Sequence, residues 1–173
     1  SPDDIKRANI PHEVFLTNLI GNHILMAVGA GGVAGSFPWV MAIIPLTSFA
    51  LLGYILWRAR CSLTRDPWYP MCHWQVCARR SRIFILMLSL LLAIVLLGWI
   101  GYSYLGLRRE AVLAIIVGMG ILPIMATVLV LILLESETLY HANQAKLPAW
   151  VVALHPNPPD IPVIEEVKPH YYD

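Results

Sequence analysis

The chain has 173 residues, of which 58% are hydrophobic and only 13% are charged, and its formal net charge is +1. Soluble domains carry about 25% charged residues, so this composition, with a mean hydropathy of +0.66, excludes an ordinary soluble domain. The small net charge also argues against binding to nucleic acid, which uses a concentration of basic residues. The composition therefore predicts a membrane protein.

Long uncharged stretches, taken in chain order, predict where the chain crosses the membrane. No charged residue occurs in 14–57, 83–107 or 111–134. About 20 helical residues cross a hydrocarbon core of about 30 Å. The second and third stretches therefore each fit one crossing, and the first stretch, with 44 residues, fits two.

A break in the first stretch comes at the sequence AGSFPW, residues 34–39. Gly35 loosens the chain, Ser36 can cap the following helix, and Pro38 is suited to a first helical turn. The sequence thus predicts an all-α integral membrane protein with four transmembrane helices in two antiparallel hairpins, at about 14–34, 38–57, 83–105 and 112–134.

The basic residues predict the orientation of these helices. An even number of crossings puts both termini on one side, together with most of the basic residues: Lys6, Arg7, Arg58, Arg60, Arg65, Arg79, Arg80, Arg82, Lys146 and Lys168. Only Arg108 and Arg109 fall on the other side. The positive-inside rule therefore predicts cytoplasmic termini, in a plasma membrane or a bacterial inner membrane. The first 13 residues contain no hydrophobic signal region, which agrees with this orientation.

The same pattern divides the chain into segments. We expect a cytoplasmic N-terminal segment, a first hairpin, a basic and aromatic cytoplasmic loop, a second hairpin, and a cytoplasmic interfacial segment with a proline-rich tail, at 1–13, 14–57, 58–82, 83–134 and 135–173. Glu135 and Glu137 come just past the last apolar stretch. They are expected to form an ordinary solvated helix end rather than a catalytic pair.

The expected loop 58–82 combines cysteines, a histidine, arginines and tryptophans, and three interpretations compete. A metal site would need Cys72, His73 and Cys77 to converge, but the loop has no C-x-x-C motif and its spacing is irregular. Nucleic-acid binding is disfavoured because membrane helices tether both ends of the loop. We therefore predict no metal and a role in anchoring at anionic phospholipids and the aromatic belt, for Arg58, Arg60, Arg65, Arg79, Arg80, Arg82, Trp57, Trp68 and Trp74.

The sequence TNLIGNH, residues 17–23, is the most conspicuous polar cluster within a predicted membrane helix. His23 is expected near the middle of the membrane, where a histidine is a functional candidate by default. With Asn22 it could contact a haem or a quinone, or relay protons. Alternatively, Thr47 and Ser48 on the next helix could exchange hydrogen bonds with His23. We prefer this structural interpretation and predict no bound cofactor.

Small residues recur at four-residue intervals on the first predicted helix, at Ala27, Gly31 and Gly35. Such a row lets another helix approach closely and is a known dimerisation face in membrane helices. The partner of this row could be the second helix of the same hairpin, a second copy of the chain, or another protein.

The C-terminal tail is expected to be extended, because five prolines between residues 156 and 169 prevent a regular helix. Extended segments dock along partner proteins through alternate side chains. The candidate anchors in this tail are Ile161, Val163, Ile164, Tyr171 and Tyr172. A competing possibility is that the tail folds back, with Glu165 and Glu166 against the arginines of 58–82.

These observations lead to a preferred function and two alternatives. The preferred function is a small, non-catalytic integral membrane subunit of a larger energy-transducing, secretion or transport complex, whose partners are other membrane subunits. The first alternative is a redox subunit that contacts haem or quinone through His23. The second alternative is a small oligomeric transporter or channel, although no predicted helix carries a charged residue in its core.

Overall fold

The computed structural model describes residues 2–159 and 166–167. It contains four helices that are long and apolar enough to cross a membrane: Pro2–Val33, Trp39–Arg65, Trp68–Tyr104 and Arg109–Asn143. The predicted helical class with four long apolar helices is therefore confirmed, and the fold is compatible with an integral membrane protein.

The first half of the chain forms two helices around one tight turn. The first helix is continuous and consists of α1 (Pro2–Leu16), a π-helical stretch η1 (Thr17–Met26) and α2 (Ala27–Val33). The second begins with a 3-10 turn, η2 (Pro38–Ala42), and continues as α3 (Ile43–Arg65). Pro38 starts η2 as the sequence predicted, because a proline lacks only a hydrogen bond that a first turn does not make.

The second half repeats this plan with longer helices. It consists of α4 (Trp68–Tyr104), followed by α5 (Arg109–Ile115), a π-helical stretch η3 (Ile116–Ile121) and α6 (Leu122–Asn143). Gly106 in the connecting turn has a φ of +67°, a conformation that glycine adopts without strain. The π-helical stretch ends two residues before Pro123, whose missing N–H and bulky ring disturb regular α-helical bonding in the preceding turn.

The region 58–82, expected as a loop between the two hairpins, is more helical than expected and is interrupted only at Asp66 and Pro67. The predicted membrane spans stop where charged residues begin. The helices continue through these residues, because arginine and glutamine are good helix formers. At 37 residues, α4 is about 55 Å long, well beyond the thickness of a hydrocarbon core. Residues 2–13 and 135–143, which the sequence placed in terminal segments, are likewise parts of α1 and α6.

A tight ion pair closes the turn between α3 and α4. The Arg58 guanidinium contacts both carboxylate oxygens of Asp66, with Nη2 to Oδ1 at 2.8 Å and Nη1 to Oδ2 at 2.7 Å. The same guanidinium lies over the Trp74 ring, 5.2 Å from its centroid. Asp66 is extended, with ψ at 152°, as expected for a residue before proline. Pro67 therefore ends α3. The Arg58 side chain, which lies on α3, holds the start of α4 against α3 through Asp66 and Trp74.

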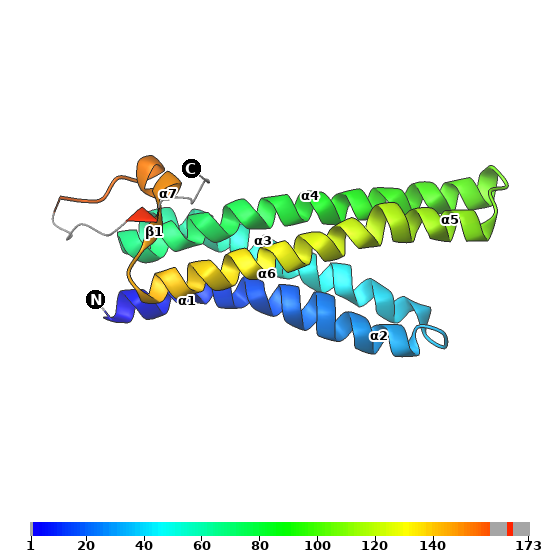
Figure 1. Ribbon diagram of the computed structural model, residues 1–173, viewed down its shortest axis with the longest axis horizontal. Coiled ribbons are helices and arrows are strands. Elements are labelled where there is room, and N and C mark those ends of the chain that lie inside the picture. Colours follow the sequence, from blue (N-terminus) through cyan, green and yellow to red (C-terminus); the bar gives the residue numbers. More distant parts are fainter. Residues whose placement is uncertain (1, 160–165, 168–173) are drawn as a thin grey trace, which may run out of the picture.

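The four long helices lie side by side along the long axis of the molecule (Figure 1). One end, which we name the basic end, holds the start of α1, the Asp66-Pro67 turn and the short helix α7 (Ala149–Leu154). The other end, the turn end, holds the connections 34–37 and 105–108. At the basic end α1 packs against α3, α4 and α6. Toward the turn end the two halves diverge, with α2 against η2 and α5 against α4 (Figure 1).

Two apolar clusters make up the core. The larger one fills the middle of the bundle and includes Phe15, Leu52, Ile55, Phe84 and Val128. The smaller one lies at the basic end, where Leu147 and Val151 cover Ala8, Cys72 and Val76. A short parallel pair, β1 (Leu147–Pro148) with β2 (Glu166–Val167), accompanies α7 there. The predicted tail anchors Ile161, Val163, Ile164, Tyr171 and Tyr172 lie outside the described residues.

Cysteine labelling tests the arrangement of the two ends across a membrane. In a variant with Cys61, Cys72 and Cys77 replaced by alanine, Thr64→Cys reports on the basic end and Leu107→Cys on the turn end, since both positions are exposed. We expect an impermeant maleimide to label Leu107→Cys on intact cells, and Thr64→Cys only after permeabilisation. Labelling of both positions from the same side would contradict a membrane-spanning bundle.

Candidate functional site

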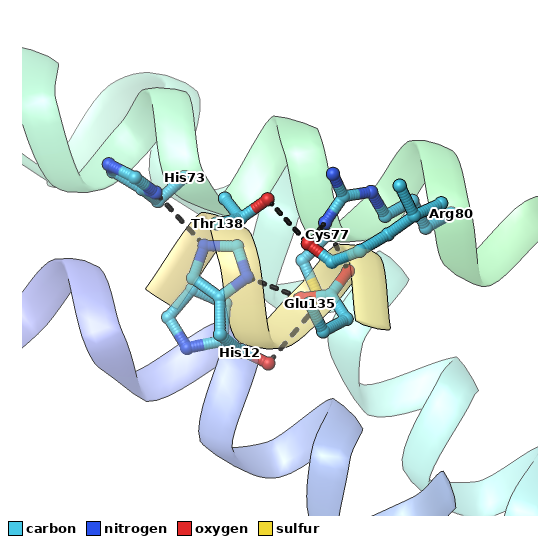
Figure 2. A network of polar contacts seen from close by, with 8 residues as sticks. His12, His73, Cys77, Arg80, Glu135 and Thr138 are labelled. Carbon is cyan, nitrogen blue, oxygen red and sulfur yellow. Dashed lines mark hydrogen bonds and ion pairs between the residues drawn. The ribbon is translucent and has the colours of Figure 1, made fainter. Parts of the chain in front are cut away.

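A buried network of charged and polar side chains joins the helices at the basic end (Figure 2). Its centre is Glu135 on α6, which is fully buried. Arg80 on α4 donates through Nη1 to Glu135 Oε1 at 2.9 Å and to the Leu134 carbonyl at 3.0 Å. The expectation that Glu135 forms a solvated helix end is therefore wrong. It is a buried carboxylate with a guanidinium partner.

Two buried histidines extend the network from Glu135. His12 on α1 places Nδ1 2.5 Å from Glu135 Oε2, and its Nε2 lies 2.9 Å from Nδ1 of His73 on α4. An ionised Glu135 only accepts hydrogen bonds, so His12 carries a proton on Nδ1. A neutral His12 then accepts at Nε2 from His73 Nδ1–H. The hydrogen bonds thus converge on Glu135, which accepts from Arg80 on one side and from His12 on the other, with His73 donating to His12.

Neighbouring contacts fasten the same three helices. The Cys77 thiol donates to the Pro11 carbonyl at 3.3 Å, joining α4 to α1. The Tyr69 hydroxyl donates to the Ala142 carbonyl at 2.8 Å, joining α4 to α6. The Tyr69 ring also meets the His73 ring edge to face, with centroids 4.8 Å apart. The network is therefore set in a frame of helix-to-helix contacts.

Helical spacing explains how these side chains come together. His73, Cys77 and Arg80 recur at intervals of four and three residues, which puts them on one face of α4. Glu135 and Thr138 share one face of α6 for the same reason. This spacing is present in the sequence. It was missed because the charges of these regions suggested a loop and a solvated end.

A second polar cluster lies deeper in the bundle, on η1 and α3. His23 Nε2 lies 2.9 Å from Ser48 Oγ, and Asn18 Nδ2 donates to the same oxygen at 3.0 Å. Asn22 Nδ2 contacts Asn18 Oδ1 at 3.1 Å and the Ile44 carbonyl at 2.9 Å. The predicted hydrogen bond between His23 and Ser48 is confirmed. Because Ser48 uses the His23 Nε2, this conformation does not present that nitrogen to a haem.

An apolar layer separates the two polar clusters. Phe15 and Phe84 meet at 6.2 Å between ring centroids, and Phe84 also lies against the His23 ring at 4.9 Å. All three side chains are buried. The deeper cluster is therefore isolated from the charged network by packed aromatic rings.

The predicted membrane anchors fall into two groups. Arg60, Arg65, Arg79, Arg82 and Trp57 are exposed at the basic end, where they could meet lipid. The remaining four are engaged within the protein. Arg58 and Arg80 form the ion pairs described above, the Trp74 side chain is buried, and Trp68 Nε1 donates to the His155 carbonyl at 3.0 Å. The Trp74 ring is therefore packed inside the protein and does not face lipid.

The metal interpretation rested on the three cysteines of 58–82 and on its one histidine, His73. Cys61, Cys72 and Cys77 are free thiols, and the last two are buried. Among the residues that the structure describes, no group of three or more histidine, cysteine or acidic side chains is placed to hold a metal. His12, His73 and Glu135 are close together but face one another through hydrogen bonds. They do not converge on a common point.

The small-residue row on the first helix is shorter than predicted. Ala27 and Gly31 lie on α2, but that helix ends at Val33, so Gly35 belongs to the following turn. A Cβ atom added at Gly31 or Gly35 would meet nothing within 4 Å. The chain's own helices therefore do not cover these glycines.

Comparison with known proteins adds no relative to this description. No family model, no curated protein and no solved structure matches the chain.

Replacing the central carboxylate tests the network. Glu135→Gln keeps the shape of the side chain but leaves Arg80 and His12 without their charged partner. Breaking a buried ion pair from one side costs roughly 3 kcal/mol, so we expect a clearly lower midpoint of thermal unfolding in mild detergent. Glu13→Gln is the matched control, because Glu13 is exposed one residue from His12. Equal midpoints for the two variants would show that the network does not stabilise the bundle.

Proposed function

We propose that the protein is a small, non-catalytic integral membrane subunit that packs laterally against the helices of another membrane protein. The observation that supports this best is the divergence of the two halves at the turn end, while the basic end is tied together (Figure 1). Where the two halves of the chain diverge at the turn end, the helix surfaces that would face each other are not covered by the chain's own helices. In a membrane they must meet either lipid or another protein.

The small residues of α2 favour a protein helix as the neighbour. Ala30 is buried on the side of α2 that faces its own hairpin. Gly31 is exposed, and the space around its Cα is open. Helices associate in membranes largely through close packing at such small residues. Gly31 thus offers a place where the backbone of a second helix could come close to α2.

The chemistry inside the bundle also favours a packing role. The groups that could act in catalysis or proton transfer, His12, His73, Glu135 and Arg80, contact one another. His23 contacts Ser48. These contacts give less support to the redox alternative, in which His23 would hold a haem or a quinone, than to a structural role. They hold the two hairpins in a fixed relation and so shape the divergent turn end.

The proposed orientation places the basic end in the cytoplasm. Arg60, Arg65, Arg79 and Arg82 are exposed there, and only Arg108 and Arg109 occur at the turn end. The positive-inside rule favours this orientation. The exposed arginines would then face the anionic lipids of the cytoplasmic leaflet, at about 1 kcal/mol each.

Co-purification from native membranes tests the proposal. We expect a tagged chain, extracted in mild detergent, to bring down one or more stoichiometric membrane proteins identifiable by mass spectrometry. Gly31→Leu should reduce their recovery about tenfold, the effect of losing about 1.4 kcal/mol of binding free energy. A differently tagged second copy of the chain distinguishes a homo-oligomer from a complex with another protein.

Gly29→Leu is the matched control for this experiment. Gly29 is also exposed, and a Cβ atom there also meets nothing within 4 Å. Two residues along a helix correspond to a rotation of about 200°, so Gly29 faces away from Gly31. A chain that emerges alone, or equal losses in the two variants, would contradict lateral packing through this face.

A further inference from the structure

A pocket opens on the surface of the basic end, between α4, α6 and α7. Its volume is about 450 Å³, and Arg80, Glu137, His141 and Trp150 are among the residues that line it. The pocket borders the buried network, because Arg80 belongs to both. The Arg80 side chain is 17% exposed and makes both of its described contacts through Nη1. Part of its guanidinium therefore forms the pocket wall.

The pocket lies where the apolar part of the bundle ends. Leu134 is the last residue of an uncharged stretch, and its carbonyl accepts a hydrogen bond from Arg80. Ile83 and Leu134 lie three residues from Arg80 and Glu137 toward the turn end, on the same helix faces. Their side chains are 50% and 39% exposed. An apolar surface thus continues from the pocket toward the middle of the membrane.

The charges in the pocket wall balance one another. Arg80 supplies a cation and Glu137 an exposed carboxylate, while Glu135 behind Arg80 already accepts one of its N–H groups. An anion would meet Arg80 but also the Glu137 carboxylate, and Arg80 is already partly neutralised by the buried Glu135. A ligand that carries both a phosphate and a primary ammonium matches the wall better, because each of its charges finds an opposite one.

Trp150 gives the pocket an interfacial wall. Its ring is half-buried and lies under the Arg79 guanidinium, 4.5 Å from the ring centroid. Tryptophan is favoured at the depth of lipid headgroups because its ring is apolar and its N–H is polar. The pocket therefore combines a headgroup-level aromatic wall, a balanced pair of charges and an adjoining apolar surface.

We infer that this pocket binds the headgroup of phosphatidylethanolamine. The lipid phosphate accepts hydrogen bonds from Arg80, and its ammonium donates to the Glu137 carboxylate. The acyl chains then lie along the exposed apolar side chains of Ile83 and Leu134. This site is separate from the small-residue face of α2 and does not depend on the packing function.

Native mass spectrometry of the detergent-purified protein tests this site. The chain is mixed with equal amounts of phosphatidylethanolamine, phosphatidylcholine and phosphatidylglycerol, and the bound lipids are compared. We expect about a fivefold preference for phosphatidylethanolamine over the other two, because phosphatidylcholine has no ammonium N–H to donate and phosphatidylglycerol has no cation. Glu137→Gln should abolish this preference, and the control Glu13→Gln should retain it.

Three outcomes would overturn the inference. These are no preference in the wild-type chain, a preference for phosphatidylglycerol, or equal behaviour of Glu137→Gln and Glu13→Gln. Excess glycerophosphoethanolamine, the soluble headgroup, serves as a competitor. We expect it to displace little of the bound lipid, because it lacks acyl chains. Full displacement would assign the pocket to a soluble ligand instead.

Discussion

The burial of the Glu135 carboxylate is the constraint on which the rest of this structure depends. A buried charge is tolerated only when it is paired and hydrogen-bonded. Arg80 and His12 meet this requirement from two other helices, at 2.9 Å and 2.5 Å. Their positions fix the register of α1, α4 and α6 relative to one another. His73 then completes a network that would lose its partners if any one of these helices shifted.

The rest of the architecture follows from where this network lies. At the basic end the polar network joins α1, α4 and α6, and the apolar cluster joins α1 and α4 to α7. Phe15 and Phe84 seal the network from the deeper cluster around Ser48. Beyond that cluster no described side-chain hydrogen bond links the first half of the chain to the second, and the halves diverge (Figure 1). A molecule that is tied at one end and open at the other is well suited to receive a neighbouring helix.

Sequence reasoning succeeded where a single physical rule decides the outcome. The uncharged stretches located the apolar parts of all four helices, because lipid excludes charge. The pairing of His23 with Ser48 followed from matching depths on neighbouring helices. Reasoning failed at the basic end, where Glu135 and His73 looked like solvated residues of a helix end and a loop. Their burial depends on the joint register of three helices, which no single stretch reveals, although the spacing of His73, Cys77 and Arg80 marked one face of a helix.

Hydrogen–deuterium exchange of the α1 amides tests most directly whether the network makes the N-terminal residues part of the folded bundle. Local stability is read from how slowly backbone amides exchange. If Glu135 and His73 hold His12 in place, we expect the α1 amides around Ala8 and Phe15 to exchange about as slowly as the α4 amides around Val76. In the Glu135→Gln variant, we expect exchange to become faster in α1 before it does so in the other helices. Rapid exchange throughout α1 in the wild-type protein would contradict the account, because the network would then not hold this helix.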